Sequence, residues 1–253
     1  MDASKLIVFY DIASGPPFRT YAINPWRTRI ALNAKQLHYR TEWVDITEIK
    51  TVRGQLGVPP TEKMPDGSDR YTLPIIHDQS KSEFIGDQFE IALYLDKEYP
   101  SSGVKLFPDS TSVDLARTVE EHTNSLFYQF FGLLTSGIPL NPETAAITKA
   151  DFASRFGAKS WEDMGFEGEA RIQKVEELRA AFESLAKLYR VNEDGTQGPF
   201  FEGRASPVYA DLIVAGWMRV LQRSFREFEE VKTWHGGLWA RIHSETEKFA
   251  QVK

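Results

Sequence analysis

Cysteine is absent from all 253 residues of the chain. Without a thiol group, the protein cannot form disulfide bonds, thiolate metal ligands or a cysteine nucleophile. Disulfides are typical of oxidising compartments, so a chain without cysteine is most simply interpreted as cytoplasmic. The five histidines do not show the close spacing of paired metal ligands on one helix, and we expect no metal site.

The chain also lacks long apolar runs and any excess of basic residues. Residues 6–10 form a run too short for the core of a signal peptide, and residues 212–218 are far too short to span a membrane. Lysine and arginine total 30 against 36 acidic residues, which gives a net charge of −6, and they form no cluster. The sequence therefore predicts neither a membrane protein nor a nucleic-acid-binding protein.

The first hundred residues alternate strand patterns with helical patterns. Apolar and β-branched runs predict strands over residues 5–10, 38–46, 71–77 and 82–85. Apolar residues three or four apart predict helices over residues 25–35, 47–56 and 88–99, with a loop over 58–69. This order is typical of an α/β thioredoxin-like domain with a parallel first strand pair and a final antiparallel hairpin. We expect that domain to span residues 1–100.

The remainder of the chain is dominated by helical patterns. Residues 101–111 are rich in turn-forming types and predict a linker. Helical spacing then appears over residues 113–134, 167–189, 207–221 and 231–248, the last of these interrupted near Gly236 and Gly237. We therefore expect an all-α C-terminal domain over residues 112–253.

Three helix starts carry capping signals. Asn24 and Pro25 are suited to the cap and the first position of the helix over 25–35. Asp87 can cap the helix that follows it. Ser206 and Pro207 are start signals for the helix over 207–221, and we expect them to provide its cap, since Val208 has no side-chain group that could do so.

Pro74 lies inside the strand-like stretch YTLPII, where it cannot donate a hydrogen bond to a neighbouring strand. An ordinary trans proline at a sheet edge is the commoner explanation. A cis peptide bond is the alternative, and it would leave the N–H and C=O groups of Leu73 free to pair with an extended ligand. Further on, Asp87 and Gln88 stand where a helix N-terminus could hold the charged groups of an amino acid.

Several segments occur together in an order that resembles a known family. They are VFYDI, WRTRIALNAK, YTLPII, DQFEIALYLDKEYP, KLFP and SPVYADLIVAGW. Over essentially its whole length the chain resembles a glutathione S-transferase. The WRTRIAL, TEKMPDGS and EIALYLDKEYP segments most closely resemble the fungal-specific class A of basidiomycetes, which is related to bacterial β-etherases.

The resemblance implies a glutathione site. Leu73, followed by a cis Pro74, would pair through its backbone with the cysteinyl unit of glutathione. Asp87 would bind the γ-glutamyl ammonium, and Gln88 stands where the family has a serine for the carboxylate. Lys63 is a candidate for the glycyl carboxylate, although a solvated loop lysine is the favoured interpretation.

The resemblance also predicts a serine near the sulfur of glutathione, and this chain lacks it. Counting back four residues from Trp26 reaches Ala22, whose methyl group cannot donate a hydrogen bond. Asn24, Tyr21 and the backbone N–H groups at the helix start are the nearest substitutes. We expect glutathione binding with only modest activation of its thiol.

Aromatic residues mark a second candidate region. In the family, a helix that carries Phe127, Tyr128 and Phe131 borders the pocket for the hydrophobic substrate, and Trp217 on a later helix can face the same space. Packing in the helical core is an equally favoured interpretation. Aromatic side chains suit flat aromatic or phenolic ligands through stacking.

Three functions are compatible with this sequence. The first is a transferase that conjugates glutathione or cleaves aryl ethers, with weak activity because of Ala22. The second is a ligandin that sequesters hydrophobic phenolics without reaction. The third is an interaction module that has lost glutathione binding. The resemblance also implies a homodimer.

Overall fold

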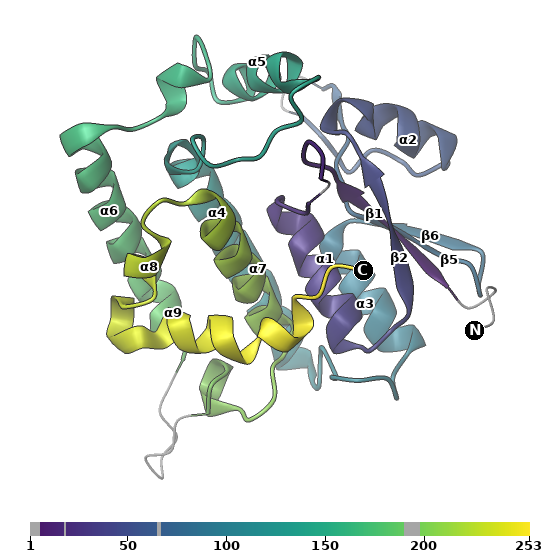
Figure 1. The fold of residues 1–253 in the computed structure, drawn as a ribbon. Helices are drawn as coiled ribbons and strands as arrows, with labels where there is room; N and C mark the ends of the chain where they lie inside the picture. The colour runs from purple at the N-terminus through teal and green to yellow at the C-terminus, as the bar shows by residue number, and fades with distance from the viewer. Residues whose placement is uncertain (1–5, 18, 65–66, 190–197) are drawn as a thin grey trace. The chain divides into compact units, whose positions relative to one another are not determined.

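The computed structural model describes residues 6–17, 19–64, 67–189 and 198–253 (Figure 1). The chain divides into two compact units. The first comprises Met1–Lys105, Pro139–Thr148 and Phe249–Lys253, and the second comprises Leu106–Ile138 and Lys149–Lys248. The main division thus falls inside the expected linker, and two short segments from the later part of the chain belong to the first unit.

A mixed sheet of four strands forms the centre of the first unit. Its order is β2 (Tyr39–Val44), β1 (Ile7–Ile12), β5 (Ile75–Asp78) and β6 (Glu83–Gly86). β1 is parallel to β2 and antiparallel to β5, which pairs antiparallel with β6. The predicted parallel first pair and antiparallel hairpin are confirmed. Helices α1 (Ile23–Ala34) and α3 (Gln88–Glu98) pack against each other beside this sheet (Figure 1).

Three predicted elements around the sheet differ in the structure. The strand expected over 71–77 begins only at Ile75, because Pro74 has no N–H group to give to a sheet. The expected loop over 58–69 contains a short antiparallel hairpin, β3 (Glu62–Lys63) with β4 (Asp69–Arg70). The helix expected over 47–56 is divided into the 3-10 turn η2 (Ile46–Glu48) and the helix α2 (Ile49–Gln55).

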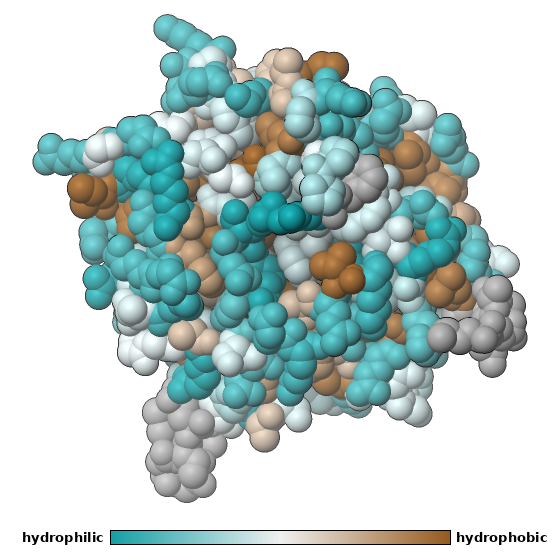
Figure 2. Space-filling view, in the orientation of Figure 1, coloured by the Kyte–Doolittle hydropathy of each residue, from teal (hydrophilic) through white to brown (hydrophobic). Residues whose placement is uncertain are grey.

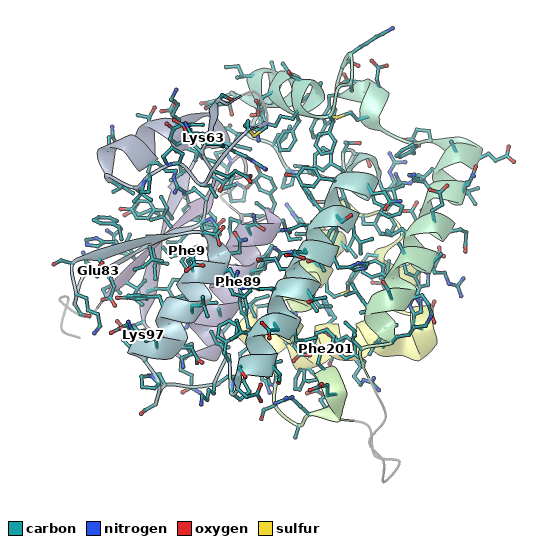
Figure 3. All side chains as sticks on the ribbon, turned by 180° about the vertical axis from the view of Figure 1, so that it is seen from behind. Phe9, Lys63, Glu83, Phe89, Lys97 and Phe201 are labelled. Atoms are coloured by element: carbon teal, nitrogen blue, oxygen red, sulfur yellow. The ribbon has the colours of Figure 1, made fainter. Side chains whose placement is uncertain are left out.

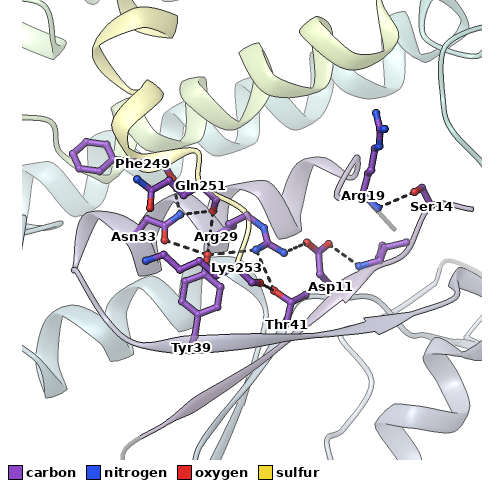
Figure 4. A network of polar contacts seen from close by, with 11 residues as sticks. Asp11, Ser14, Arg19, Arg29, Asn33, Tyr39, Thr41, Phe249, Gln251 and Lys253 are labelled. Carbon is purple, nitrogen blue, oxygen red and sulfur yellow. Dashed lines mark hydrogen bonds and ion pairs between the residues drawn. The ribbon is translucent and has the colours of Figure 1, made fainter. Parts of the chain in front are cut away.

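The end of the chain docks on α1 in the first unit (Figure 4). The side-chain amide of Asn33 donates to the carbonyl oxygens of Phe249 and Gln251, both at 2.8 Å. One turn earlier, Arg29 pairs with Asp11 of β1 at 2.7 Å, and both side chains are fully buried. These contacts attach α1 to the sheet on one side and to the C-terminal segment on the other.

Helices make up the described part of the second unit. The α-helices that lie wholly within it are α4 (Ser110–Phe130), α6 (Gly168–Ala186), α7 (Tyr209–Ser224), α8 (Phe228–Val231) and α9 (Trp234–Glu245). Helix α5 (Ala145–Arg155) carries residues of both units, and the sequence analysis did not predict it. Short 3-10 turns are η3 (Phe131–Leu133), η4 (Glu162–Met164), η5 (Phe201–Gly203) and η6 (Glu247–Phe249). Helix α7 is buried along almost its whole length and packs on α4 and α9.

Two details of the later helices follow from local chemistry. The predicted interruption at Gly236 and Gly237 is confirmed, since both have positive φ angles of 68° and 79°, which glycine adopts readily. The N-cap of α7 is Val208, so the expected cap by Ser206 with Pro207 is wrong. Asp211 instead accepts hydrogen bonds from the N–H groups of Val208 at 2.8 Å and Phe201 at 2.9 Å.

The described surface carries both hydrophilic and hydrophobic groups. On the face shown in Figure 2, hydrophobic residues are scattered in small groups among hydrophilic ones. Among the described residues, no helix combines the length and the apolar character needed to cross a membrane.

Candidate glutathione site

Leu73 lies two residues before the start of β5. The Leu73–Pro74 peptide bond is cis, as the resemblance implies. The Leu73 side chain points into the core, with 1% of the residue exposed. Neither the N–H nor the C=O group of Leu73 makes a hydrogen bond to another of the described residues. An unpaired main chain next to a sheet is suited to pairing with an extended peptide.

Asp87 and Gln88 lie directly beside this main chain. The N–H of Asp87 donates to the carbonyl oxygen of Pro74 at 3.3 Å. Asp87 caps α3 as predicted, because its Oδ1 accepts from the N–H of Phe89 at 2.9 Å, and Gln88 is the first residue of the helix. Two segments separated in sequence are thus brought together at one edge of the sheet.

The backbone of Asp87 is strained. Its φ of 78° and ψ of 133° lie in a region that side-chain-bearing residues rarely adopt. Such a conformation costs about 1–3 kcal/mol and persists where the surrounding structure holds it, often at ligand-binding positions. The hydrogen bond from the Phe89 N–H holds the Asp87 carboxylate in place at this position.

Lys63 lies elsewhere in the first unit, on the hairpin between β3 and β4. Its ammonium pairs with Asp69 across that hairpin at 2.6 Å, and its side chain is 70% exposed. Hydrogen bonding to Asp69 raises the pKa of Lys63. Figure 3 shows Lys63 at the end of the unit opposite to Lys97 of α3. The arrangement is that of a solvated loop lysine with a local acidic partner.

Ala22, at the expected serine position, is the N-cap of α1. Its backbone is extended, with φ −83° and ψ 142°, and its carbonyl oxygen accepts from the N–H of Trp26 at 3.1 Å. The predicted cap at Asn24 is therefore wrong, because the helix already begins at Ile23. Pro25 is tolerated in the first turn, where its missing N–H would have had no partner within the helix.

Two side-chain donors remain near this helix start. The carbonyl Oδ1 of Asn24 accepts from Arg27 at 3.1 Å, which leaves the amide NH2 group of Asn24 without a partner among the described residues. The hydroxyl of Tyr21 also makes no hydrogen bond to a described residue. Burial, followed by the carboxylates of Asp45 and Asp11, raises the pKa of Tyr21, so its phenol stays protonated and remains a donor.

The comparison with protein families decides the relationship. Residues 116–249 match the glutathione S-transferase C-terminal domain, and residues 23–98 match the glutathione S-transferase N-terminal domain. This chain belongs to the glutathione S-transferase family. The fold expected from the resemblance, a thioredoxin-like domain followed by a helical domain, is confirmed.

Solved structures of fungal glutathione S-transferases resemble this one over nearly the whole chain. CsGST63524 of Ceriporiopsis subvermispora, in complex with glutathione, is 32% identical, with a TM-score of 0.85 and 98% of each chain covered. CsGST83044 of the same fungus, also in complex with glutathione, is 29% identical, with a TM-score of 0.85, covering 96% of this chain and 98% of its own. GSTFuA3 of Phanerochaete chrysosporium is 28% identical, with a TM-score of 0.86 and 98% of each chain covered. A search of curated proteins found no match.

The predicted aromatic residues of this glutathione S-transferase form one cluster in the second unit, but their exposure differs. Phe127 contacts Tyr128, Phe131 and Trp217, with ring centres 5.9, 5.2 and 5.9 Å away. Phe131 and Trp217 are each 1% exposed, whereas Tyr128 is 50% exposed. Phe131 also stacks on Phe156 with ring centres 4.5 Å apart. Phe131 and Trp217 therefore support the cluster from the core, while Phe127 and Tyr128 are its more accessible members.

The sequence analysis missed two polar groups near the site. Arg53 of α2 is 2% exposed and donates to two backbone carbonyl groups of the loop before Leu73. Asp45 accepts from Asn141 at 2.7 Å and Thr144 at 2.8 Å, two residues from a distant part of the sequence. No sequence pattern marks either contact, since an arginine in a short helix and an acidic residue before a turn are ordinarily solvated. Among the described residues, no acidic or histidine cluster has the arrangement of a metal site.

Proposed function

We propose that the protein binds glutathione along the main chain of Leu73 and at the N-terminus of α3. The observation that carries this proposal is the backbone of Leu73, which has no partner among the described residues and lies next to Asp87 and Gln88. The two neighbours that were crystallised with glutathione support it, because their sequences align with this one over almost the entire chain.

Each part of glutathione has a complementary group in this arrangement. The N–H and C=O of Leu73 would pair with the cysteinyl unit, as two strands pair. The Asp87 carboxylate uses Oδ1 to cap α3, and its Oδ2 would bind the γ-glutamyl ammonium. The N–H groups at the start of α3, together with Gln88, would bind the γ-glutamyl carboxylate, which the helix dipole also favours.

We propose a transferase activity of the type that the resemblance to the fungal-specific class related to β-etherases implies. We expect this activity to be weak because Ala22 replaces the serine. The glutathione thiolate would attack an electrophilic carbon of an aromatic or aryl-ether substrate, forming a thioether as the halide or phenolate leaves with the bonding electrons. A free thiol with a pKa near 8.5 is mostly protonated at pH 7, so the thiolate needs stabilising donors. Asn24 and Tyr21 would provide them in place of the serine that Ala22 replaces.

The hydrophobic substrate or ligand is proposed to contact Phe127 and Tyr128. These rings are accessible members of the aromatic cluster, and ring stacking suits flat aromatic or phenolic molecules. Phe131 and Trp217 would hold them in place from the core.

A ligandin is the second candidate function. The observation that favours it is Ala22, which offers no donor to the sulfur and caps α1 without any side-chain hydrogen bond. A protein of this kind would bind glutathione and phenolics without catalysing a reaction between them.

Three measurements separate these functions. Glutathione at ten times its dissociation constant should stabilise the protein by about 1.4 kcal/mol, which a thermal shift detects. No shift at millimolar glutathione would instead favour an interaction module that has lost the ligand. Conjugation of a chlorinated nitrobenzene, or cleavage of an aryl-ether model, would identify a transferase. Phenolics that displace a fluorescent naphthalene sulfonate, without any turnover, would identify a ligandin.

A further inference from the structure

Arg53 connects the candidate glutathione site to the loop that precedes it. Its Nε donates to the carbonyl oxygen of Pro59 at 3.0 Å, and its Nη2 donates to the same oxygen. Its Nη1 donates to the carbonyl oxygen of Thr72 at 2.5 Å. Pro59 and Thr72 lie at the two ends of the loop that carries β3 and β4. The buried guanidinium of Arg53 therefore joins the two ends of this loop, immediately before Leu73.

The hydrogen bond to Thr72 has a consequence on the other side of the same peptide unit. The Thr72 carbonyl and the Leu73 N–H share one planar trans peptide group, in which they point in opposite directions. Once Arg53 holds the carbonyl, the direction of the Leu73 N–H is fixed. The charged donor also polarises the peptide group, which strengthens the hydrogen bond that the N–H can give.

Neighbouring residues keep the guanidinium in this place. A Cβ atom added to Gly86 would lie 3.0 Å from Nη2 of Arg53 and 3.5 Å from Nη1, so the absence of a side chain makes room for it. Gly86 immediately precedes Asp87, and Asp87 favours the charged form of Arg53. Burial nevertheless lowers the pKa of Arg53 overall. Thr61 and Thr72 bond to each other through their hydroxyls at 2.8 Å, which closes the loop a second time.

We propose that Arg53 is a positioning residue for glutathione, which orients the Leu73 N–H toward the cysteinyl unit without touching the ligand. This inference rests on the proposed function, because it concerns the same site. Arg53 contacts the peptide group before Leu73 and lies against the residue before Asp87, so it sets the relative positions of both halves of the site.

The test measures glutathione affinity by calorimetry for the wild type, Arg53→Met and Arg53→Lys. Without Arg53 the Leu73 N–H is no longer held in place, so loss of its hydrogen bond to the cysteinyl unit predicts affinity about two- to tenfold weaker for Arg53→Met. Arg53→Lys keeps the charge and an N–H donor group but not the planar fork that reaches both carbonyls, so it should recover part of that loss. Gly86→Ala should weaken binding in the same direction without removing the charge.

Arg171 provides a matched control in the second unit. It is 6% exposed, pairs with Glu227 at 2.7 Å and donates to the carbonyl oxygen of Leu133 at 3.2 Å. Arg171→Met should lower the melting temperature, as Arg53→Met does, and leave glutathione affinity unchanged. For Arg53→Lys, which we expect to fold, KM for glutathione should rise while kcat at saturating glutathione changes less than about twofold.

A direct readout is the amide proton resonance of Leu73 in the unliganded protein, which should move upfield in Arg53→Lys as its peptide group is less polarised. If the wild type binds no glutathione, the proposed function fails and this inference fails with it. If the wild type binds but Arg53→Lys and Gly86→Ala bind equally well, the site stands and the positioning role of Arg53 is refuted.

Discussion

Replacing Ala22 by serine tests how the thiol of glutathione is activated. Ala22 already has the extended backbone of an N-cap, so a serine needs no backbone change at this position. Its Oγ would accept from the N–H of Asn24, because Pro25, the next position that a cap can reach, has no N–H. The serine hydroxyl hydrogen would then be free to point toward the sulfur.

Two effects of different size follow from this geometry. A new cap that satisfies one N–H stabilises a helix by about 0.5–1 kcal/mol, which raises the melting temperature of a chain of this size by about 2 °C. A hydrogen bond to a charged group contributes about 1.5–3 kcal/mol. If the sulfur of bound glutathione lies next to residue 22, the pKa of its thiol should therefore be about 1–2 units lower in Ala22→Ser than in the wild type.

The assay is a pH titration of the thiolate absorbance in the glutathione complex, accompanied by a melting curve. Ala22→Gly is the matched control, since it also alters the cap but adds no hydroxyl, and it should leave the thiol pKa unchanged. If Ala22→Ser raises the melting temperature and leaves the thiol pKa as it was, the sulfur is not at this helix start and the account of Ala22 as a lost donor is wrong.

Other predictions concern the remaining donors and the buried charges. Asn24→Ala should lower kcat/KM about tenfold, and Tyr21→Phe less than about threefold, because Asn24 is partly exposed whereas Tyr21 is buried, with 6% of the residue exposed; the reverse order in a conjugation assay would assign the role to Tyr21. Asp11→Ala leaves the buried Arg29 without its acidic partner and should cost about 3–5 kcal/mol of unfolding free energy. A loss below about 1 kcal/mol in urea titrations would contradict a dry ion pair. Burial raises the pKa of Asp211 to about 7, above its unfolded value of 3.8. Protonation of Asp211 therefore contributes up to about 4 kcal/mol to the free energy of unfolding. This contribution is fully present below about pH 4 and is lost as the pH rises through about 7. Asp211→Asn should remove this dependence of the unfolding free energy on pH. If both proteins show the same dependence, other groups cause it.

Local periodicity was sufficient to predict most of the first unit. Strand β1 and helix α3 lie within two residues of the bounds predicted for them at each end, and residue 5 of the predicted strand lies outside the described residues. These elements depend on short-range patterns, which a single sequence carries. The resemblance to glutathione S-transferases, rather than any local pattern, implied that Leu73 and Asp87 lie close together, and the pairing of β5 with β6 shows how they meet.

Features that depend on contacts between distant segments were not predictable. Arg53 turns inward because two carbonyls of the following loop meet around it, and nothing in α2 itself signals this. Asp211 compensates for Val208 with a second hydrogen bond to Phe201, which lies outside the helix. Tyr128 and Phe131 are both aromatic and lie three residues apart on one predicted helix, so the sequence does not distinguish them. The exposure of Tyr128 and the burial of Phe131 depend on which other helices pack beside α4 and η3.

A crystal structure with glutathione tests the central claim most directly. The account predicts that the cysteinyl carbonyl oxygen of glutathione lies within about 3 Å of the Leu73 nitrogen, with the γ-glutamyl ammonium on Asp87. Glutathione bound away from the Leu73 backbone, or a Leu73 N–H that pairs with the protein itself, would contradict it.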